Sequence, residues 1–291
     1  MFDSILYYYL HKNTVLPYKI DMRFILTLCP LTDNQPLIFN YQYPFMAWVY
    51  GRLNEADQQY AEFLHQKGYQ VHSSLKNFKH FTFSNFQIAR LAQSPKPGDK
   101  YMKLSNEPIK VLVSFYIDKA AEDFIVGLFR NQIVSIYDAV HRASFNIERI
   151  ESLPNETFGN QALVLQTISP MVVARKKADG KDDYLSPEDP DFAAYFAYNL
   201  MEKYNSVNPE ATKVDVETAA RLVKFRLLKK DKLKSRLVAI KQNKTSETKV
   251  RAFTNFSFEV SAPAEVLEVG FLGGFGKHSA NGFGCCEVVG N

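Results

Sequence analysis

The chain has 291 residues, of which 46% are hydrophobic and 23% charged, proportions that are typical of soluble globular proteins with a sizeable core. No apolar run is long enough to cross a bilayer, and the three cysteines have no spacing that suits a disulfide framework or a zinc site. We therefore expect a reduced, cytoplasmic protein without a membrane anchor.

The net charge of +4 is unevenly distributed along the chain. The segment 221–251 contains twelve Lys and Arg residues against two acidic ones, a local charge of +10. A concentrated basic segment on an otherwise acidic chain indicates a polyanionic partner. The same composition is also that of a solvated, charged hairpin, and this feature by itself favours neither interpretation.

The first half of the chain predicts the order strand, helix, strand, strand, helix, strand. The predicted strands are 23–29, 81–86, 109–117 and 143–150, and the helices are 44–53 and 120–130. Asp57 is suited to cap a further helical piece that ends at His65. Such a βαββαβ order is the ferredoxin-like pattern.

The second half repeats this order more loosely. It predicts strands at 161–173, 222–228, 236–240, 253–260 and 282–289, a helix at 190–204, and a short helix capped by Ser261 and opened by Pro263. Strands 222–228 and 236–240 flank a lysine-rich turn and predict a basic hairpin. We expect an α+β protein with two tandem ferredoxin-like (RRM-like) βαββαβ domains, at 22–153 and 160–291, behind an N-terminal extension at 1–21.

A glycine-rich loop at 270–284 is the most distinctive segment, with six glycines in fifteen residues. Glycines allow positive φ and a close approach of backbone N–H groups to an anion. A Walker motif is excluded because His278 stands where Ser or Thr is needed, and a dinucleotide fingerprint fails because Ser279 stands in place of its last glycine. The loop therefore favours a clasp for phosphates over a glycine-rich hairpin without a ligand.

The loop, followed by Gly-Phe-Gly-Cys at 282–285, resembles the corresponding segment of the CRISPR-associated pre-crRNA endoribonucleases. These enzymes are the sixth numbered Cas family and belong to the repeat-associated mysterious proteins. Supporting motifs occur in the family's order: Met-Arg-Phe at 22–24, Asn-Tyr-Gln-Tyr at 40–43, Phe-Leu-His at 63–65, Phe-Thr-Phe-Ser at 81–84 and Thr-Ile-Ser-Pro at 167–170. The resemblance covers the chain from Met22 to Val289.

This resemblance implies a metal-independent endoribonuclease that cleaves CRISPR precursor RNA within the repeat. The RNA's own 2′-hydroxyl would attack, leaving a 2′,3′-cyclic phosphate or 3′-phosphate and a 5′-hydroxyl, so no metal or cofactor is expected. His65, Tyr50 and Lys79 stand at the family's catalytic positions, with Lys76 as the alternative to Lys79. A histidine suits the proton transfer because its pKa, about 6.5, lies near neutral pH.

The spacing of Tyr50 and His65 has a geometric consequence. Fifteen residues along one straight helix would place them roughly 22 Å apart, too far to share a phosphate. A shared site therefore requires the chain to fold back near 54–57, where Asn and Asp interrupt the helical pattern.

We assign RNA contact to the glycine loop and to the predicted strand 222–228, where Lys224 and Arg226 alternate with apolar residues. The assigned residues are Gly273, Gly274, Gly276, Lys277, His278, Ser279, Lys224, Arg226, Lys229 and Lys230. The expected partner is CRISPR repeat RNA, effector-complex subunits are a second expected class of partner, and the expected state is a monomer or homodimer. Two alternatives stay open: a non-catalytic RNA-binding subunit of an effector complex, and a nucleotide-binding enzyme that uses the glycine loop.

Overall fold

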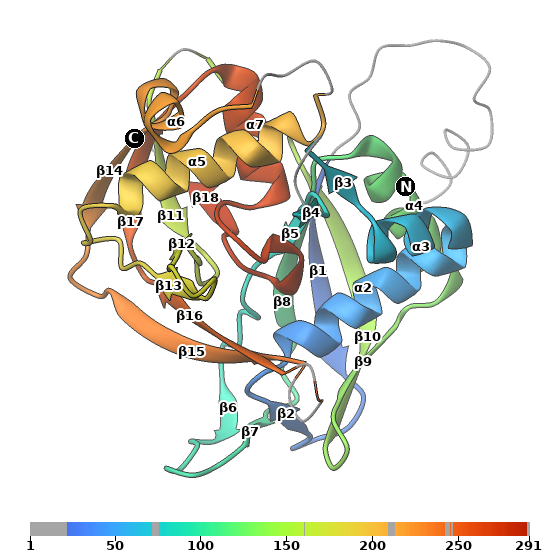
Figure 1. Cartoon of the computed structure of the whole chain (residues 1–291). Helices are drawn as coiled ribbons and strands as arrows, with labels where there is room; N and C mark the ends of the chain where they lie inside the picture. Colours follow the sequence, from blue (N-terminus) through green and yellow to red (C-terminus); the bar gives the residue numbers. More distant parts are fainter. Residues whose placement is uncertain are drawn as a thin grey trace, which may run out of the picture.

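The computed structural model describes residues 22–71, 76–159, 161–208, 213–241, 245 and 247–289. The expected N-terminal extension, 1–21, lies outside this part of the chain. The described residues form two units side by side, each an antiparallel sheet with helices packed against it (Figure 1). No helix among the described residues is long and apolar enough to cross a membrane.

The first unit is built on a five-stranded sheet. Its strands lie in the order β5 (Phe81–Phe83), β8 (Ile109–Phe115), β1 (Arg23–Pro30), β10 (Arg142–Leu153) and β9 (Ile133–Tyr137). Its helices are α2 (Gln42–Ala56), α3 (Gln58–Gln66) and α4 (Asp118–Arg130). In α2 the fully buried Phe45, Val49 and Leu53 recur every four residues and form the face that packs on the core.

The second unit repeats this arrangement around a four-stranded sheet. Its strands lie in the order β14 (Lys224–Lys229), β17 (Ser257–Ser261), β11 (Leu163–Thr167) and β18 (Cys286–Val288). Its helices are α5 (Phe192–Asn205), α6 (Val216–Leu222) and α7 (Ala264–Gly273). In the second sheet the first strand, β11, lies between the third and fourth strands, β17 and β18, which is the ferredoxin-like topology. The first sheet has the same arrangement with one additional edge strand, β9: its first strand, β1, lies between β8 and β10. The predicted α+β architecture of two tandem ferredoxin-like units is confirmed.

Short strands outside the two main sheets complete the described part of the fold. They are β2 (Pro36–Ile38), β7 (Tyr101–Leu104) and β6 (Leu91–Gln93) in one sheet, and the pairs β3 (Tyr69–Gln70) with β4 (Asn77–Phe78), β12 (Ala174–Lys176) with β13 (Asp182–Tyr184), and β15 (Lys234–Ile240) with β16 (Thr248–Thr254). None of these was predicted apart from β15 and part of β16, because segments this short show too little periodicity.

The predicted basic hairpin between strands 222–228 and 236–240 is wrong. Strand β14 pairs with β17, whereas β15 pairs with β16 in a separate two-stranded arm. The physical reason is Phe225 in β14, whose ring packs 5.0 Å from that of Phe192, 4.9 Å from Phe196 and 5.1 Å from Phe258. These contacts hold β14 in the core, and the basic hairpin of the structure is β15–β16.

Three predicted boundaries in the second half also need correction. The strand expected at 161–173 ends at Thr167, shortly before Pro170, which has no N–H for a sheet. The strand expected at 253–260 is two strands, because Asn255 adopts a left-handed φ of 62° between β16 and β17. Ser261 does not cap the following helix, since it is paired with Lys224 in the sheet, and α7 begins after Pro263 without a side-chain cap.

The predicted glycine loop is partly helical, since 270–273 form the last turn of α7. A Cβ on Gly270 would stand 2.4 Å from the ring of Phe275, so glycine here lets that ring pack against the helix. The loop that remains, 274–284, lies between α5 and β5, at the junction of the two units (Figure 1). Buried side chains of both units join in one continuous cluster across this junction.

Candidate active site and glycine loop

Tyr50 and His65 lie together because the chain folds back between α2 and α3. Helix α2 ends at Ala56, and Asp57 takes an extended conformation with φ −143° and ψ 101°. Its side chain then accepts a hydrogen bond of 2.9 Å from the Tyr60 N–H, which starts α3. The ring centroids of Tyr50 and His65 are consequently 5.4 Å apart. The interruption near 54–57 that a shared site requires is present.

Lys79 reaches the same place from the segment that precedes β5. Its Nζ donates to the backbone oxygens of Leu64 and of His65, the latter at 3.0 Å. Both oxygens belong to the last turn of α3, where carbonyls have no partner within the helix. Lys79 therefore closes the end of α3 and fixes the backbone of His65. Burial lowers the pKa of Lys79 to about 8.

The three side chains differ in exposure and in protonation. His65 is exposed, whereas Tyr50 and Lys79 are half-buried. Burial raises the pKa of Tyr50 above that of a free tyrosine, so its hydroxyl stays protonated at neutral pH and can only act as a donor there. The Tyr50 ring also packs edge-on against Phe81 of β5, with centroids 5.6 Å apart. The site thus combines an accessible imidazole, a protonated phenol and an ammonium of lowered pKa.

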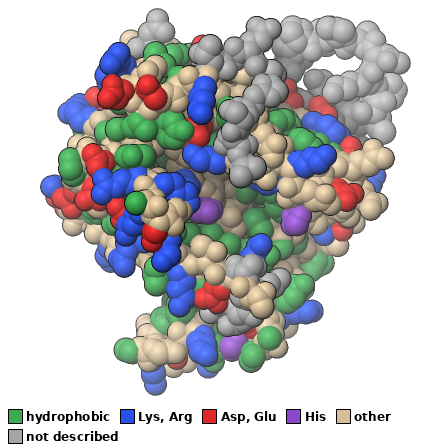
Figure 2. Space-filling model, in the orientation of Figure 1, with side chains coloured by type: hydrophobic (Ala, Val, Ile, Leu, Met, Phe, Trp, Pro, Cys, Tyr) green, Lys and Arg blue, Asp and Glu red, His purple; other side chains and the backbone are tan. Residues whose placement is uncertain are grey.

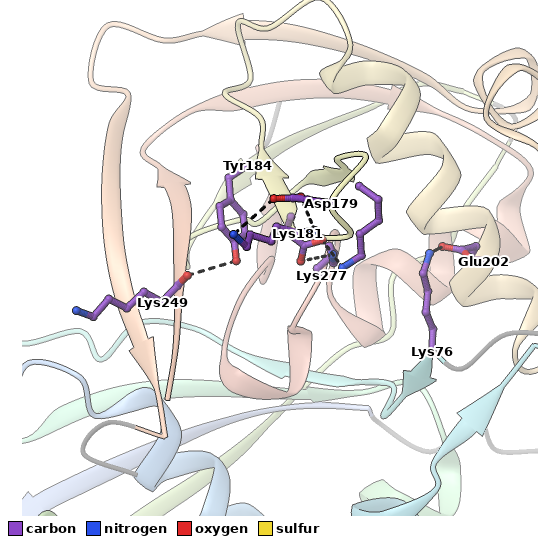
Figure 3. Close-up of polar contacts among 9 residues, drawn as sticks. Lys76, Asp179, Lys181, Tyr184, Glu202, Lys249 and Lys277 are labelled. Atoms are coloured by element: carbon purple, nitrogen blue, oxygen red, sulfur yellow. Dashed lines mark hydrogen bonds and ion pairs between the residues drawn. The ribbon is translucent and has the colours of Figure 1, made fainter. Parts of the chain in front are cut away.

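Lys76, the alternative to Lys79, is directed elsewhere. Its Nζ is 2.5 Å from the Glu202 carboxylate on α5 (Figure 3) and 5.1 Å from the ring centroid of Tyr198. This ion pair links the two units. Lys76 therefore contacts the second unit, whereas Lys79 contacts α3 beside His65.

Of the six residues assigned to RNA contact in the glycine loop, Gly273, Gly274 and Gly276 are buried, with carbonyl oxygens that accept hydrogen bonds from Lys203 of α5. Ser279 is buried as well, at the start of a short 3₁₀ turn, η1 (Ser279–Asn281). The three glycine carbonyls, which would repel a phosphate, therefore point into the protein towards Lys203.

Lys277 and His278 are the more accessible of these six residues. The Lys277 N–H donates to the Val172 oxygen at 2.7 Å, and its Nζ lies 2.6 Å from the Asp182 carboxylate. His278 has a left-handed φ of 61°, and burial lowers the pKa of its imidazole to about 4. At neutral pH the imidazole of His278 is therefore uncharged, while the Lys277 ammonium forms an ion pair with Asp182.

The assigned residues of β14 lie on the far edge of the second sheet, away from α3 (Figure 1). Lys224 and Arg226 are exposed on one face of the strand, and Lys229 is exposed at its end. Arg226 forms a bidentate pair with Glu259 at 2.8 and 3.1 Å, and Lys230 lies 2.8 Å from Glu188. An RNA that touched both β14 and the Tyr50–His65 site would have to extend across the molecule.

Two buried polar residues were missed at the level of sequence. His80 directly follows Lys79, has a left-handed φ of 51°, and places its Nε2 2.8 Å from the Ser206 hydroxyl. Lys203 lies in α5, seven residues after the core residue Phe196, so its helical phase points inward. The sequence signal that could have identified Lys203 is its helical spacing from Phe196, which places a lysine on the apolar face of α5. Among the described residues, no three His, Cys, Asp or Glu side chains are grouped to hold a metal ion.

Comparison with protein families places this geometry in a known group. Residues 36–150 match the family model of the CRISPR-associated protein Cas6 N-terminal region, and residues 153–288 match that of the Cas6 C-terminal region. The two matches together span most of the chain. The chain belongs to the Cas6 family.

Individual relatives agree with this placement. The chain is 27% identical over 257 residues to "CRISPR-associated endoribonuclease Cas6 1" of Methanocaldococcus jannaschii, covering 87% of this chain and 88% of the relative. Two solved structures share the Cas6 fold. One, "Characterization of a Cas6-related gene from Pyrococcus furiosus", has a TM-score of 0.72 at 21% identity and covers 92% of this chain and 98% of that chain. The other, "An RAMP protein binding different RNA substrates", has a TM-score of 0.71 at 22% identity and covers 92% and 100%.

Proposed function

We propose that this chain is an endoribonuclease that cleaves CRISPR precursor RNA within the repeat and so generates mature guide RNA. The observation that carries the proposal is the meeting of Tyr50, His65 and Lys79, which come from three separate segments of a Cas6-family fold. The named activity of the Methanocaldococcus jannaschii relative supports it.

The proposed reaction needs only groups that the RNA and these side chains supply. The 2′-hydroxyl loses its proton to a base and its oxygen bonds to the adjacent phosphorus, while the bond from phosphorus to the 5′-oxygen breaks. An acid protonates that 5′-oxygen. The products are a 2′,3′-cyclic phosphate, which can open to a 3′-phosphate, and a 5′-hydroxyl. Because the nucleophile belongs to the RNA, the proposed step requires no metal-activated water.

The geometry suggests a role for each side chain. His65 is exposed at the end of α3, where RNA can reach its imidazole, and we assign it the proton transfer. Tyr50 keeps its proton, so its hydroxyl can donate a hydrogen bond to charge that develops on the phosphate. An ammonium has three N–H donors, and two of those on Lys79 hold α3. The third can serve a phosphate oxygen.

RNA contact outside the reacting phosphate is proposed for the glycine loop, through its more accessible residues Lys277 and His278, and for β14 together with the adjacent Lys230. Lys and Arg side chains also gather over the β12–β13 hairpin and its surroundings on the face shown in Figure 2. Four cations of this group are Arg175, Lys176, Lys177 and Lys181. Several of them are balanced by Asp182 and Asp183, so their contribution to RNA affinity should be modest and should fall with salt.

A cleavage assay in EDTA tests the proposed function. The wild-type chain is mixed with its cognate repeat RNA, and the ends of the products are mapped. We expect cleavage at one position, a cyclic or 3′-phosphate end, and no cleavage by His65→Ala, although that variant still binds the RNA. Binding without cleavage by the wild type would instead identify a non-catalytic RNA-binding subunit, and undiminished cleavage by His65→Ala would refute the proposed mechanism.

A further inference from the structure

Lys203 is a buried cation whose partners are carbonyl oxygens. Its side chain is 1% exposed, and its Nζ donates to the oxygens of Gly274, of Gly276 at 3.2 Å and of Gly273 at 3.5 Å. Within the described part of the chain, no carboxylate lies within ion-pair distance of it. Burying an ammonium without a counter-charge is unfavourable, so the hydrogen bonds to the loop must offset that cost.

The loop that Lys203 holds is pressed against β5 of the first unit. A Cβ on Gly274 would stand 2.8 Å from the Cβ of Thr82, and a Cβ on Gly282 would stand 2.2 Å from the ring of Phe83. The Thr82 hydroxyl donates to the Phe283 oxygen at 2.9 Å. Because glycine is required for these approaches, the loop and the strand fit together only while the loop keeps its present course.

Strand β5 in turn carries contacts to the proposed active site. Phe81, next to Thr82, packs its ring 5.6 Å from that of Tyr50. Lys79, two residues earlier, donates to the backbone oxygen of His65. A continuous series of contacts therefore runs from Lys203 through the loop and β5 to the side chains proposed to cut RNA, and it crosses from one unit to the other.

We propose that Lys203 is a positioning residue, whose ammonium holds the glycine loop against β5 and thereby keeps Lys79 and Phe81 in contact with His65 and Tyr50. The inference rests on the proposed endoribonuclease function for its kinetic consequence, but its structural part is independent of that function. It makes the second unit, which contains none of the proposed catalytic side chains, necessary for the geometry of the first.

Protonation of Lys203 provides a distinguishing property. Burial lowers its pKa to about 7. A neutral amine has two N–H donors and a lone pair, so it cannot donate to three carbonyls, and its hold on the loop weakens as the proton is lost. The titratable group that faces Lys203 is His80, which stays neutral because burial and the Lys203 charge lower its pKa to about 3. Ser206 joins them, since its hydroxyl donates to the Lys203 oxygen at 2.8 Å.

The test compares Lys203→Met, which removes the charge, with Lys203→Arg, which keeps a permanent one. Phe192→Leu is the matched control, because Phe192 is a buried residue of the same helix whose ring packs on Phe196 and Phe225 and not directly on a residue of the loop. Single-turnover cleavage rate, RNA affinity and thermal stability are measured for all three. We expect Lys203→Met to cut about tenfold to a hundredfold more slowly, with RNA affinity within about threefold of wild type.

The pH profile separates positioning from mere stabilisation of the fold. The ratio of the Lys203→Arg rate to the wild-type rate should rise from about pH 6 to about pH 8.5, because only the wild-type side chain loses its proton in that range. If Arg does not fit the buried site, the pH dependence of the Lys203→Met cleavage rate provides the test. This variant should lack the part of the alkaline decline that deprotonation of Lys203 causes in the wild type.

Hydrogen exchange supplies a readout that does not depend on RNA. In Lys203→Met, amides of 274–284 and of Phe81–Phe83 should exchange faster, whereas Phe192→Leu should leave both segments protected. If wild type fails to cleave but these amides respond as expected, the proposed function fails and the positioning role stands. A Lys203→Met variant that cleaves as fast as Phe192→Leu, or that leaves both segments protected, would overturn the inference.

Discussion

The ring of Tyr50 lies 5.4 Å from the ring of His65, although the two residues belong to different helices and are separated by the Asp57 break. Lys79 completes the group by donating to the His65 backbone oxygen at 3.0 Å. The arrangement depends on a helix cap, a helix end and a strand from the same unit, and each of these supports can be altered separately.

Removing the Tyr50 hydroxyl should slow cleavage while the fold is kept. Tyr50→Phe preserves the ring that packs on His65 and Phe81, and it removes only the donor proposed for the developing phosphate charge. We expect single-turnover cleavage to slow about tenfold to a hundredfold, with thermal stability and RNA affinity near wild type. Because burial raises the pKa of Tyr50, the neutral part of the pH profile should keep its shape. A Tyr50→Phe variant of wild-type rate would exclude the hydroxyl from the reaction.

Lys79 should introduce an alkaline decline into the cleavage rate. Burial lowers its pKa from 10.5 to about 8, so the cation is present below about pH 8 and is lost as pH rises through that value. Beyond the decline near pH 7 that we propose for Lys203, we expect the wild-type rate to fall further above about pH 8. Lys79→Arg, which stays charged, should keep part of the activity and move that decline to higher pH.

Lys79→Met provides the matched neutral variant. It removes the charge and the hydrogen bonds to α3, so it should be slow at every pH. An unchanged alkaline decline in Lys79→Arg would show that another group is responsible.

The cap at Asp57 should matter for both stability and rate. Its carboxylate accepts from the Tyr60 N–H at 2.9 Å and lies 2.7 Å from the Lys119 ammonium. Asp57→Ala removes the acceptor that starts α3, so we expect a lower Tm and a slower cleavage step, because His65 at the other end of this helix loses its fixed position. Asp57→Asn keeps a capping oxygen without the charge, and it should retain most of the rate. Equal loss in both variants would instead point to the ion pair with Lys119.

Gly284 should be the glycine of the loop that tolerates substitution least. Its φ is +71°, and a Cβ there would stand 1.7 Å from the backbone oxygen of Phe275. Gly284→Ala should therefore destabilise the fold by about 3 kcal/mol, because backbone on both sides must shift. Gly180→Ala is the control, since it has a similar φ of +79° but no heavy atom within 4 Å. It should cost only the backbone strain, about 1–2 kcal/mol, and comparable losses in chemical denaturation would contradict the steric explanation.

The order of the long elements was predictable because each is a local pattern. Apolar residues at helical spacing predicted α2, and the run of β-branched and aromatic residues at 109–117 predicted β8. The Asn and Asp residues within 54–57 likewise predicted the break between the two helices. The candidate residues Tyr50, His65 and Lys79 came from the resemblance to a family, and sequence spacing added only the condition that the chain must fold back.

The errors arose where a strand's partner is decided by distant residues. Nothing local shows that β14 pairs with β17 rather than with β15, because that choice depends on Phe225 meeting the phenylalanines of α5 and β17. The orientation of the glycine loop's carbonyls was likewise decided by tertiary packing. The sequence is equally compatible with a solvent-exposed clasp at Gly273, Gly274 and Gly276. Only the position of Lys203 in the structure shows that their carbonyls face inward.

The sequence by itself determined the elements, their order and the family, since propensity, capping and motif spacing are properties of neighbouring residues. Only the tertiary structure decided which side chains meet across the two units, because those contacts depend on how two sheets and their helices pack. Tyr50 and His65 were expected to meet and do. That a lysine of α5 lies buried beneath the glycine loop, 70 residues away in the chain, follows from packing alone.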